Sequence, residues 1–122
     1  MSDRELLEWA AKAAGLQIDK SPYNGGGFGN DGFDFLGNAV LDWHNGTKWN
    51  PLTDDGDALR LAVKLRLNLH FEGFDGVEYA CAVPHKSHQG QDEPIGDDEA
   101  EATRRAIVRA AAEIGRCGEK QG

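Results

Sequence analysis

Apolar residues recur at helical intervals in two segments of the first half of the chain. The first helix is expected to begin at Ser2, which with Glu5 has the spacing of a capping box, and to be closed by Gly15. The second helix is expected to be capped in the region of Thr53 and Asp54. Its apolar positions cover more than one face and predict a largely buried helix: Ala58, Leu59, Leu61, Ala62, Val63 and Leu65.

A third helical pattern occupies the C-terminal part of the chain. It begins near Asp97, with acidic residues in its first turn and arginines farther along, as the helix dipole favours. Gly115 is expected to end this helix, because glycine is the usual residue just past a helix C-terminus. Residues 116–122 are then expected to form a frayed tail.

Between the helical segments the apolar residues change to the alternation of β-strands. Residues 39–43 and 47–49 predict two short antiparallel strands, joined by a two-residue Asn-Gly turn at positions 45–46. The segment before them, residues 21–32, is too rich in glycine for regular structure and predicts a loop.

A second hairpin is predicted from the alternation of Leu67, Leu69 and Phe71 with polar residues, followed by a turn at residues 73–76. The alternation then resumes in the order Val77, Tyr79, Cys81 and Val83, of which the last three are expected to point inward. Residues 84–96 contain prolines and glycines among polar residues. They predict a long connection that is either functional or merely tolerated.

These elements predict a single α+β domain over residues 1–122, which is a length typical of one hydrophobic core. The expected architecture is an α/β sandwich, with a mainly antiparallel sheet of about four strands packed with three helices.

Charge limits the partners that the chain is expected to bind. Its 21 acidic and 13 basic residues give a net charge of -8, which disfavours DNA and RNA because their affinity for proteins comes largely from lysine and arginine. The sequence shows no secretory signal and no apolar stretch long enough to cross a bilayer, so we expect a cytoplasmic protein without membrane contact. Its two cysteines, Cys81 and Cys117, are expected to be reduced there.

Two motifs resemble binding sites in their letters but not in their context. Residues 27–32 fit the pattern G-x-G-x-x-G, yet the strand and helix that a dinucleotide site needs do not flank them. The acidic residues Asp54, Asp55 and Asp57 lack the alternate spacing and distant carboxylate of a calcium loop, and helix capping explains them better. We therefore expect no cofactor at either place.

Histidines and a cysteine offer the remaining candidate chemistry. Cys81, His85 and His88 contain good zinc ligands, but no fourth ligand is evident and Cys81 is equally well explained as core. His44 and His70 each have an acidic residue nearby in sequence, so an acid/base pair is conceivable if folding brings them together. Neither set is complete, and the sequence predicts no metal site and no catalytic residue.

The tryptophans have both structural and functional explanations. Trp9 lies in the apolar pattern of the first helix and is expected to pack into the core, whereas Trp43 is also compatible with a binding surface. Trp49 precedes Asn50 and Pro51 and is expected to anchor the turn into the second helix.

Residues 49–52, 54–65 and 105–115, together with the first helix, resemble the phage ABA-sandwich domain family. The resemblance implies a small protein encoded by phages or prophages, with helices packed around a sheet, and it brings no established activity or catalytic residues. Because the chain is small and acidic and carries no complete set of catalytic residues, we expect an accessory phage protein that binds a host or phage protein. The alternative is a small hydrolase or metal-dependent enzyme that uses the histidines.

Overall fold

The computed structural model describes residues 1–20, 31–84 and 90–121. Within these residues, three helices and five antiparallel strands form an α+β fold, which confirms the predicted fold class. In chain order they are α1 (Asp3–Ala13), β1 (Ala39–Asp42), β2 (Thr47–Trp49), α2 (Asp55–Leu65), β3 (Asn68–Phe74), β4 (Val77–Val83), β5 (Gln91–Pro94) and α3 (Glu99–Gln121). None of these helices is long and apolar enough to cross a membrane.

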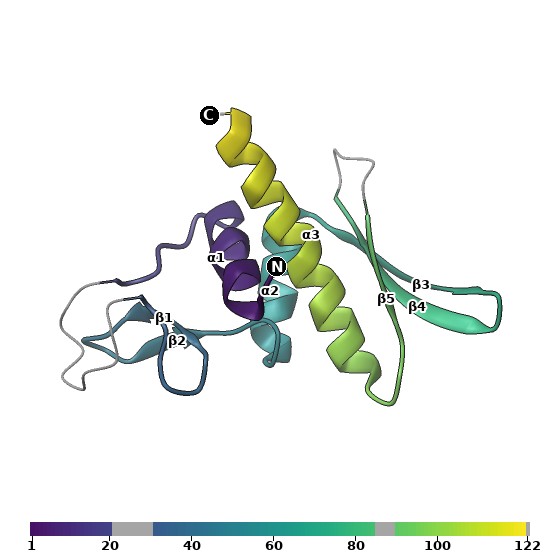
Figure 1. The fold of residues 1–122 in the computed structure, drawn as a ribbon, viewed down its shortest axis with the longest axis horizontal. Helices are drawn as coiled ribbons and strands as arrows, with labels where there is room; N and C mark the ends of the chain where they lie inside the picture. The colour runs from purple at the N-terminus through teal and green to yellow at the C-terminus, as the bar shows by residue number, and fades with distance from the viewer. Residues whose placement is uncertain (21–30, 85–89, 122) are drawn as a thin grey trace.

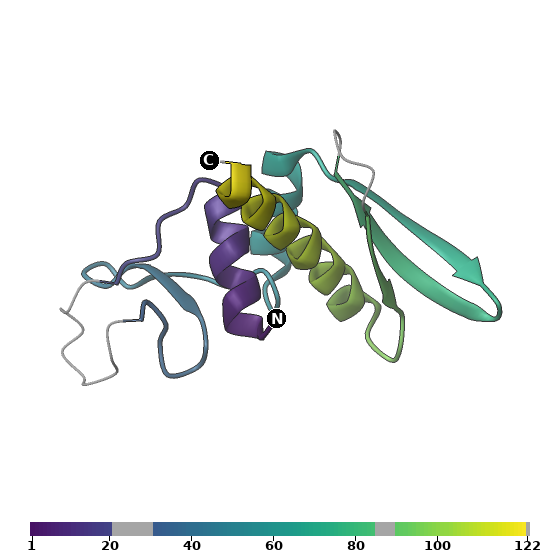
Figure 2. The same ribbon diagram turned by 45° about the horizontal axis from the view of Figure 1, so that its top comes forward.

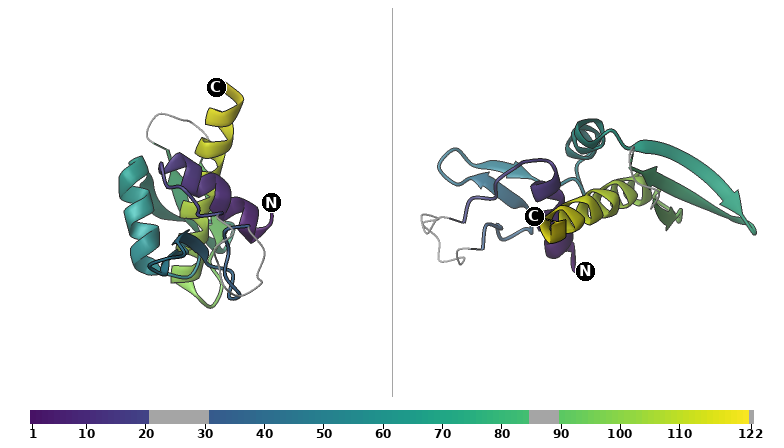
Figure 3. Two further views of the ribbon diagram at one scale, coloured as in Figure 1. Left: turned by 90° about the vertical axis from the view of Figure 1, so that its left-hand side faces the viewer. Right: turned by 90° about the horizontal axis from the view of Figure 1, so that it is seen from above.

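The strands form two small sheets where the sequence predicted one sheet of about four strands. Strands β1 and β2 pair with each other, and β3, β4 and β5 form a second sheet in that order. The helices lie between the two sheets, so the two hairpins cannot join (Figures 1 and 3). The fifth strand, β5, comes from the segment expected to be an irregular connection, where a strand of four residues leaves little pattern in the sequence.

The first hairpin has the predicted strands but a longer turn. Four residues, 43–46, separate the paired residues Asp42 and Thr47, so the predicted two-residue turn is wrong. The Asp42 carboxylate explains the longer loop, because it accepts hydrogen bonds from the backbone N–H groups of His44 at 2.9 Å and Asn45 at 3.2 Å.

Helix α1 begins with the predicted capping box and packs along α3. The Ser2 side chain accepts a hydrogen bond from the backbone N–H of Glu5, and the Glu5 side chain reaches back to Ser2. At the crossing, Gly115 of α3 lies against the backbone of Trp9, where a Cβ atom would come within 2.1 Å of the Trp9 carbonyl oxygen. Gly115 is therefore a close-packing residue inside a helix that continues to Gln121. The predicted helix end is wrong, and so is the predicted tail over residues 116–121.

Helix α2 follows a turn organised by Asn50. The Asn50 side-chain oxygen accepts a hydrogen bond from the backbone N–H of Leu52, and its backbone N–H donates to Asp57 at 2.9 Å. Asp54 caps the helix by accepting a hydrogen bond from the backbone N–H of Asp57, as predicted.

Burial of α2 is narrower than its sequence pattern predicted. Ala58, Leu61 and Ala62 are buried, whereas Leu59 is 60% exposed and Val63 is 54% exposed. Helix α2 contacts α3 on one side, so a broad apolar surface in its sequence does not become a broad buried surface.

The face of the second sheet that packs against the helices is not the predicted one. Ala82 belongs to the buried core that the helices share, and Glu93, which lies opposite Ala80 in the sheet, forms an ion pair with Arg109 of α3. Because alternate residues of a strand point to opposite faces, Cys81 lies on the face away from α3. The prediction that Tyr79, Cys81 and Val83 lie on the inward face is therefore wrong, whereas the predicted burial of Cys81 is confirmed at 2% exposure. The small side chains of Ala80 and Ala82, 1% and 0% exposed, let α3 approach the sheet closely.

Candidate functional site

Strand β3 is the outer strand of its sheet and is exposed along its whole length. Among the described residues it pairs with β4 alone, and all seven of its residues are exposed. The β3–β4 hairpin extends beyond the helices (Figures 1 and 2). Its exposed apolar side chains are Leu69, Phe71, Phe74 and Val77. A long exposed edge strand of this kind is open to pairing with an extended segment of another chain.

The two edges of this sheet differ in how they are protected. The opposite edge, β5, is four residues long, ends in Pro94 and carries the charged residues Asp92 and Glu93, all features that discourage pairing with another strand. Strand β3 contains no proline and no lysine. The hairpin that places it is closed by Asp75 and Gly76, whose φ angles of 55° and 81° suit a two-residue hairpin turn.

A cluster of metal-ligating side chains occupies the face of this sheet away from α3. His70 on β3 lies opposite Cys81 on β4, which in turn lies opposite Asp92 on β5. Glu72, two residues along β3 from His70, shares this face. The ligand atoms of His70, Glu72 and Cys81 all lie within 4.8 Å of one another. Strands β3 and β4 thus place nitrogen, oxygen and sulfur ligands together, with Asp92 of β5 opposite the cysteine.

The cysteine at the centre of this cluster is buried, whereas its neighbours are exposed. Cys81 is 2% exposed, and the side chains of His70 and Glu72 are 46% and 59% exposed. Burial, followed by hydrogen bonding to Asp92 and Glu72 and by their negative charges, raises the pKa of the Cys81 thiol to about 12. Without a cation in the cluster, Cys81 is therefore a neutral thiol at physiological pH.

The structure does not bring together the two histidines considered as an acid/base pair. His44 lies in the turn of the first hairpin, and His70 lies on β3 of the other sheet, across the helices (Figure 1). His70 is instead 3.9 Å from Glu72, measured between Nε2 and Oε2. Of the proposed zinc set, Cys81 joins this cluster, while His85 and His88 lie outside the described residues, as do positions 27–30 of the glycine motif.

Structural roles account for the acidic residues at the start of α2. Asp54 is the helix cap, Asp57 binds the backbone N–H of Asn50, and Asp55 forms an ion pair with Arg104 at 2.6 Å. The arginines of α3 are likewise paired with acids: Arg104 with Asp55, Arg105 with Asp3, Arg109 with Glu93 and Arg116 with Glu113.

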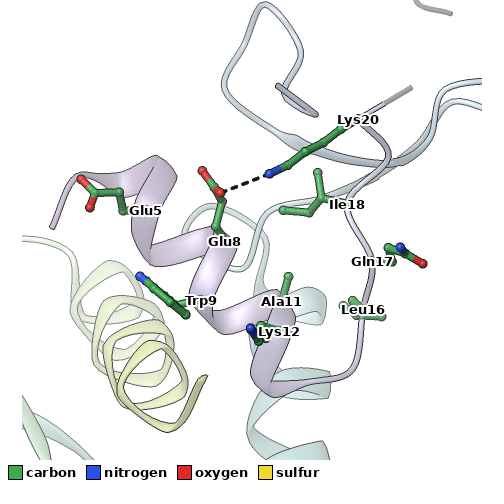
Figure 4. Close-up of a pocket in the computed structure, with 9 residues that line it drawn as sticks. All are labelled: Glu5, Glu8, Trp9, Ala11, Lys12, Leu16, Gln17, Ile18 and Lys20. Atoms are coloured by element: carbon green, nitrogen blue, oxygen red, sulfur yellow. Dashed lines mark ion pairs between the residues drawn. The ribbon is translucent and has the colours of Figure 1, made fainter. Parts of the chain in front are cut away.

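A pocket of about 620 Å³ lies between α1 and residues 16–20 (Figure 4). Its charged lining residues are Glu5, Glu8, Lys12 and Lys20, of which Glu8 and Lys20 form an ion pair with each other at 3.6 Å. Trp9, which also lines it, is half-buried and packs against the core, in keeping with its predicted role. Trp49 is buried at 6% exposure, and Trp43 donates its indole N–H to the Asp19 carbonyl at 2.9 Å. The tryptophans therefore have structural roles in this fold.

Sequence reasoning missed Glu72 and Asp92 as members of the cluster with Cys81. The alternation in β3 shows that His70 and Glu72 share a face, but the partners of Cys81 depend on the register of three strands.

No family model matches this chain, and comparison with curated proteins and with solved structures gives no significant match. The resemblance to the phage ABA-sandwich domain stays a prediction, and the fold and its surface carry the functional argument.

Proposed function

We propose that this protein is a protein-binding module that adds an extended segment of its partner to strand β3. The observation that supports the proposal is the exposed edge of β3, seven residues long and without proline or lysine. In this mode of recognition, backbone hydrogen bonds along the edge supply affinity, and pockets for alternate side chains supply specificity.

The chemistry of the hairpin defines the partner segment. Leu69 and Phe71 lie opposite Ala82 and Ala80, so they form an exposed apolar strip on one face of the sheet. The hairpin also carries acidic residues, with Glu78 on the face of the strip, Asp75 in the turn and Glu72 on the opposite face, and the whole chain has a net charge of -8. The partner segment is therefore extended, apolar at alternate positions and basic elsewhere, since opposite charges speed association.

The same charge argues against a second copy of this chain as the partner, because two strongly acidic surfaces repel each other. The resemblance stated above implies that the partner is a phage or host protein that the module meets in the bacterial cytoplasm.

A selection from a random library of nine-residue peptides tests this proposal. We expect the selected peptides to alternate apolar and basic residues, and their binding to slow hydrogen exchange of the β3 amides. The critical variant is Phe71→Lys, which places a charge on the edge strand and should weaken binding by at least about tenfold.

Leu59→Lys is the matched control. Leu59 is 60% exposed and Phe71 is 59% exposed, so the two substitutions add the same charge at equally exposed apolar positions. Peptides that bind both variants equally well, or that protect amides outside β3, would show that this edge is not the binding site.

A further inference from the structure

We propose that His70, Glu72 and Cys81 form a binding site for a zinc ion on the face of the sheet away from α3, with Asp92 beside it. This proposal does not rest on peptide binding, although two of the ligands lie on β3, and it departs from the sequence-based expectation that the chain holds no metal. The new observation is the strand register, which brings together residues from three separate strands.

The separations of the ligand atoms are close to those in a zinc site. Tetrahedral zinc, with bonds of about 2.0 to 2.3 Å, holds its ligand atoms roughly 3.3 to 3.8 Å apart. The Cys81 sulfur lies 3.6 Å from Glu72 Oε1, and His70 Nε2 lies 3.9 Å from the other oxygen of this carboxylate, Oε2. One ligand atom from each of the three residues lies within 4.8 Å of the other two, so the three atoms must come about 1 Å closer to bind one zinc ion. The side chains of His70 and Glu72 are 46% and 59% exposed, so they have room to rotate toward a bound ion.

The types of ligand select zinc over magnesium and calcium. Thiolate and imidazole are preferred zinc ligands, and a carboxylate is a common third ligand. Magnesium and calcium take six or more oxygen ligands, which this cluster does not offer. Three protein ligands leave one position of the zinc for water or for Asp92, which lies opposite Cys81 in the sheet.

Charge in the cluster also favours a cation. Glu72 and Asp92 place two carboxylates beside the sulfur of a buried cysteine. When zinc binds, the sulfur–hydrogen bond of Cys81 breaks and a sulfur–zinc bond forms, and the proton leaves to solvent. The two positive charges of zinc are then balanced by the thiolate and the Glu72 carboxylate, while His70 binds as neutral imidazole.

Titration of the metal-free full-length protein with Co²⁺, used as a spectroscopic substitute for zinc, tests this site. We expect one Co²⁺ per chain, a thiolate-to-cobalt charge-transfer band and the visible bands of tetrahedral cobalt, all abolished by added zinc. Mg²⁺ should not compete. Calorimetry of zinc binding in buffers with different ionisation enthalpies should show release of one proton per zinc.

Variants assign the ligands. Cys81→Ser should remove the charge-transfer band, whereas Cys117→Ser, which changes the other thiol, should leave it intact. Because Cys81 is buried and its variant can lose stability, the exposed ligands provide the second test. His70→Gln and Glu72→Gln should each weaken metal binding by at least about 10-fold, since loss of even an outer-shell partner costs about 10- to 100-fold.

The wild-type protein showing no charge-transfer band would overturn the proposal. So would unchanged affinity in both His70→Gln and Glu72→Gln, or loss of binding in a His85→Gln, His88→Gln double variant with His70, Glu72 and Cys81 intact. The last result would assign the metal to the site considered from sequence alone.

Discussion

Replacing Gly115 with alanine sets two physical effects against each other in the C-terminal helix. In an isolated helix the change is stabilising by about 1 kcal/mol, because alanine has the higher helix propensity. In this fold, a Cβ at position 115 would lie 2.1 Å from the carbonyl oxygen of Trp9, where ordinary contact begins at 3.4 Å. The added methyl group therefore lacks about 1.3 Å of space.

The obstructing atoms decide the size of the effect. They are the backbone oxygen and carbon of Trp9 and the backbone nitrogen of Ala13, which cannot rotate away as a side chain can. Helix α1 must therefore move from α3 along an interface that buries Leu7, Ala10 and Ala111. Overpacking costs about 1 to 3 kcal/mol, and a clash with backbone belongs at the upper end. After the gain in helix propensity, we expect Gly115→Ala to lower the free energy of unfolding by about 2 kcal/mol.

Chemical denaturation measures this change directly, and thermal denaturation should show a decrease in Tm of roughly 6 to 12 °C. Gly56→Ala is the matched control. Gly56 is also helical, but the atoms nearest to its added Cβ would be the ends of the side chains of Arg60 and Asp54, at 3.2 Å. We expect Gly56→Ala to be neutral or more stable by up to about 1 kcal/mol. A Gly115→Ala protein as stable as the wild type would refute the close contact between α1 and α3.

Four further predictions concern stability and surface chemistry. Trp49→Ala should cost roughly 3 to 5 kcal/mol of unfolding free energy, because the ring is 6% exposed; a loss under about 0.5 kcal/mol in urea denaturation would contradict its role as an anchor. Burial alone would raise the pKa of the Asp34 carboxyl, but hydrogen bonds from Lys48 and Asn38 outweigh burial and lower this pKa below its usual value of 3.8. Asp34→Asn should therefore lower the free energy of unfolding by about 1 to 3 kcal/mol at neutral pH. Because the ionised carboxylate stabilises the fold, this loss of unfolding free energy should have its full size above pH 3.8 and should shrink as the pH falls through the lowered pKa of the folded state. A loss that does not change with pH would contradict this role of Asp34. A thiol reagent at neutral pH should modify the exposed Cys117 before Cys81. The reason is that a pKa of about 12 lowers the thiolate fraction of Cys81 by roughly 10³-fold relative to an ordinary cysteine. Equal rates of modification of the two thiols in the native protein would contradict the raised pKa of Cys81. Finally, the arginines of α3 are paired with acids, so a gel-shift titration at physiological salt should show no binding of DNA or RNA; a salt-sensitive shift at low micromolar protein would mean that these pairs open.

The sequence by itself determined the elements that depend on neighbouring residues. The capping box of Ser2 and Glu5 and the cap at Asp54 are interactions across three positions, so their spacing is visible in the chain and both are confirmed. The Asp75–Gly76 turn is equally local, and the predicted second hairpin forms around it. The α+β class follows from these elements alone.

The tertiary structure decided every feature that depends on a packing partner from a distant segment of the chain. Glycine can end a helix or permit close packing between helices. Only the position of the Trp9 backbone shows that Gly115 permits close packing. Alternation in β4 defines two faces but does not show which of them α3 covers. In the structure α3 covers the face of Ala80 and Ala82, not the predicted face of Tyr79 and Cys81.

The candidate sites depend on the same distinction. A strand is an edge only when no other strand lies beside it, so the exposure of Phe71 could not be predicted from its apolar character. His70, Cys81 and Asp92 are separated by 11 residues at each step in the chain and become neighbours through the register of β3, β4 and β5. Local sequence encodes which residues can cap, turn or alternate, whereas contacts between distant segments arise only when the helices and strands pack together.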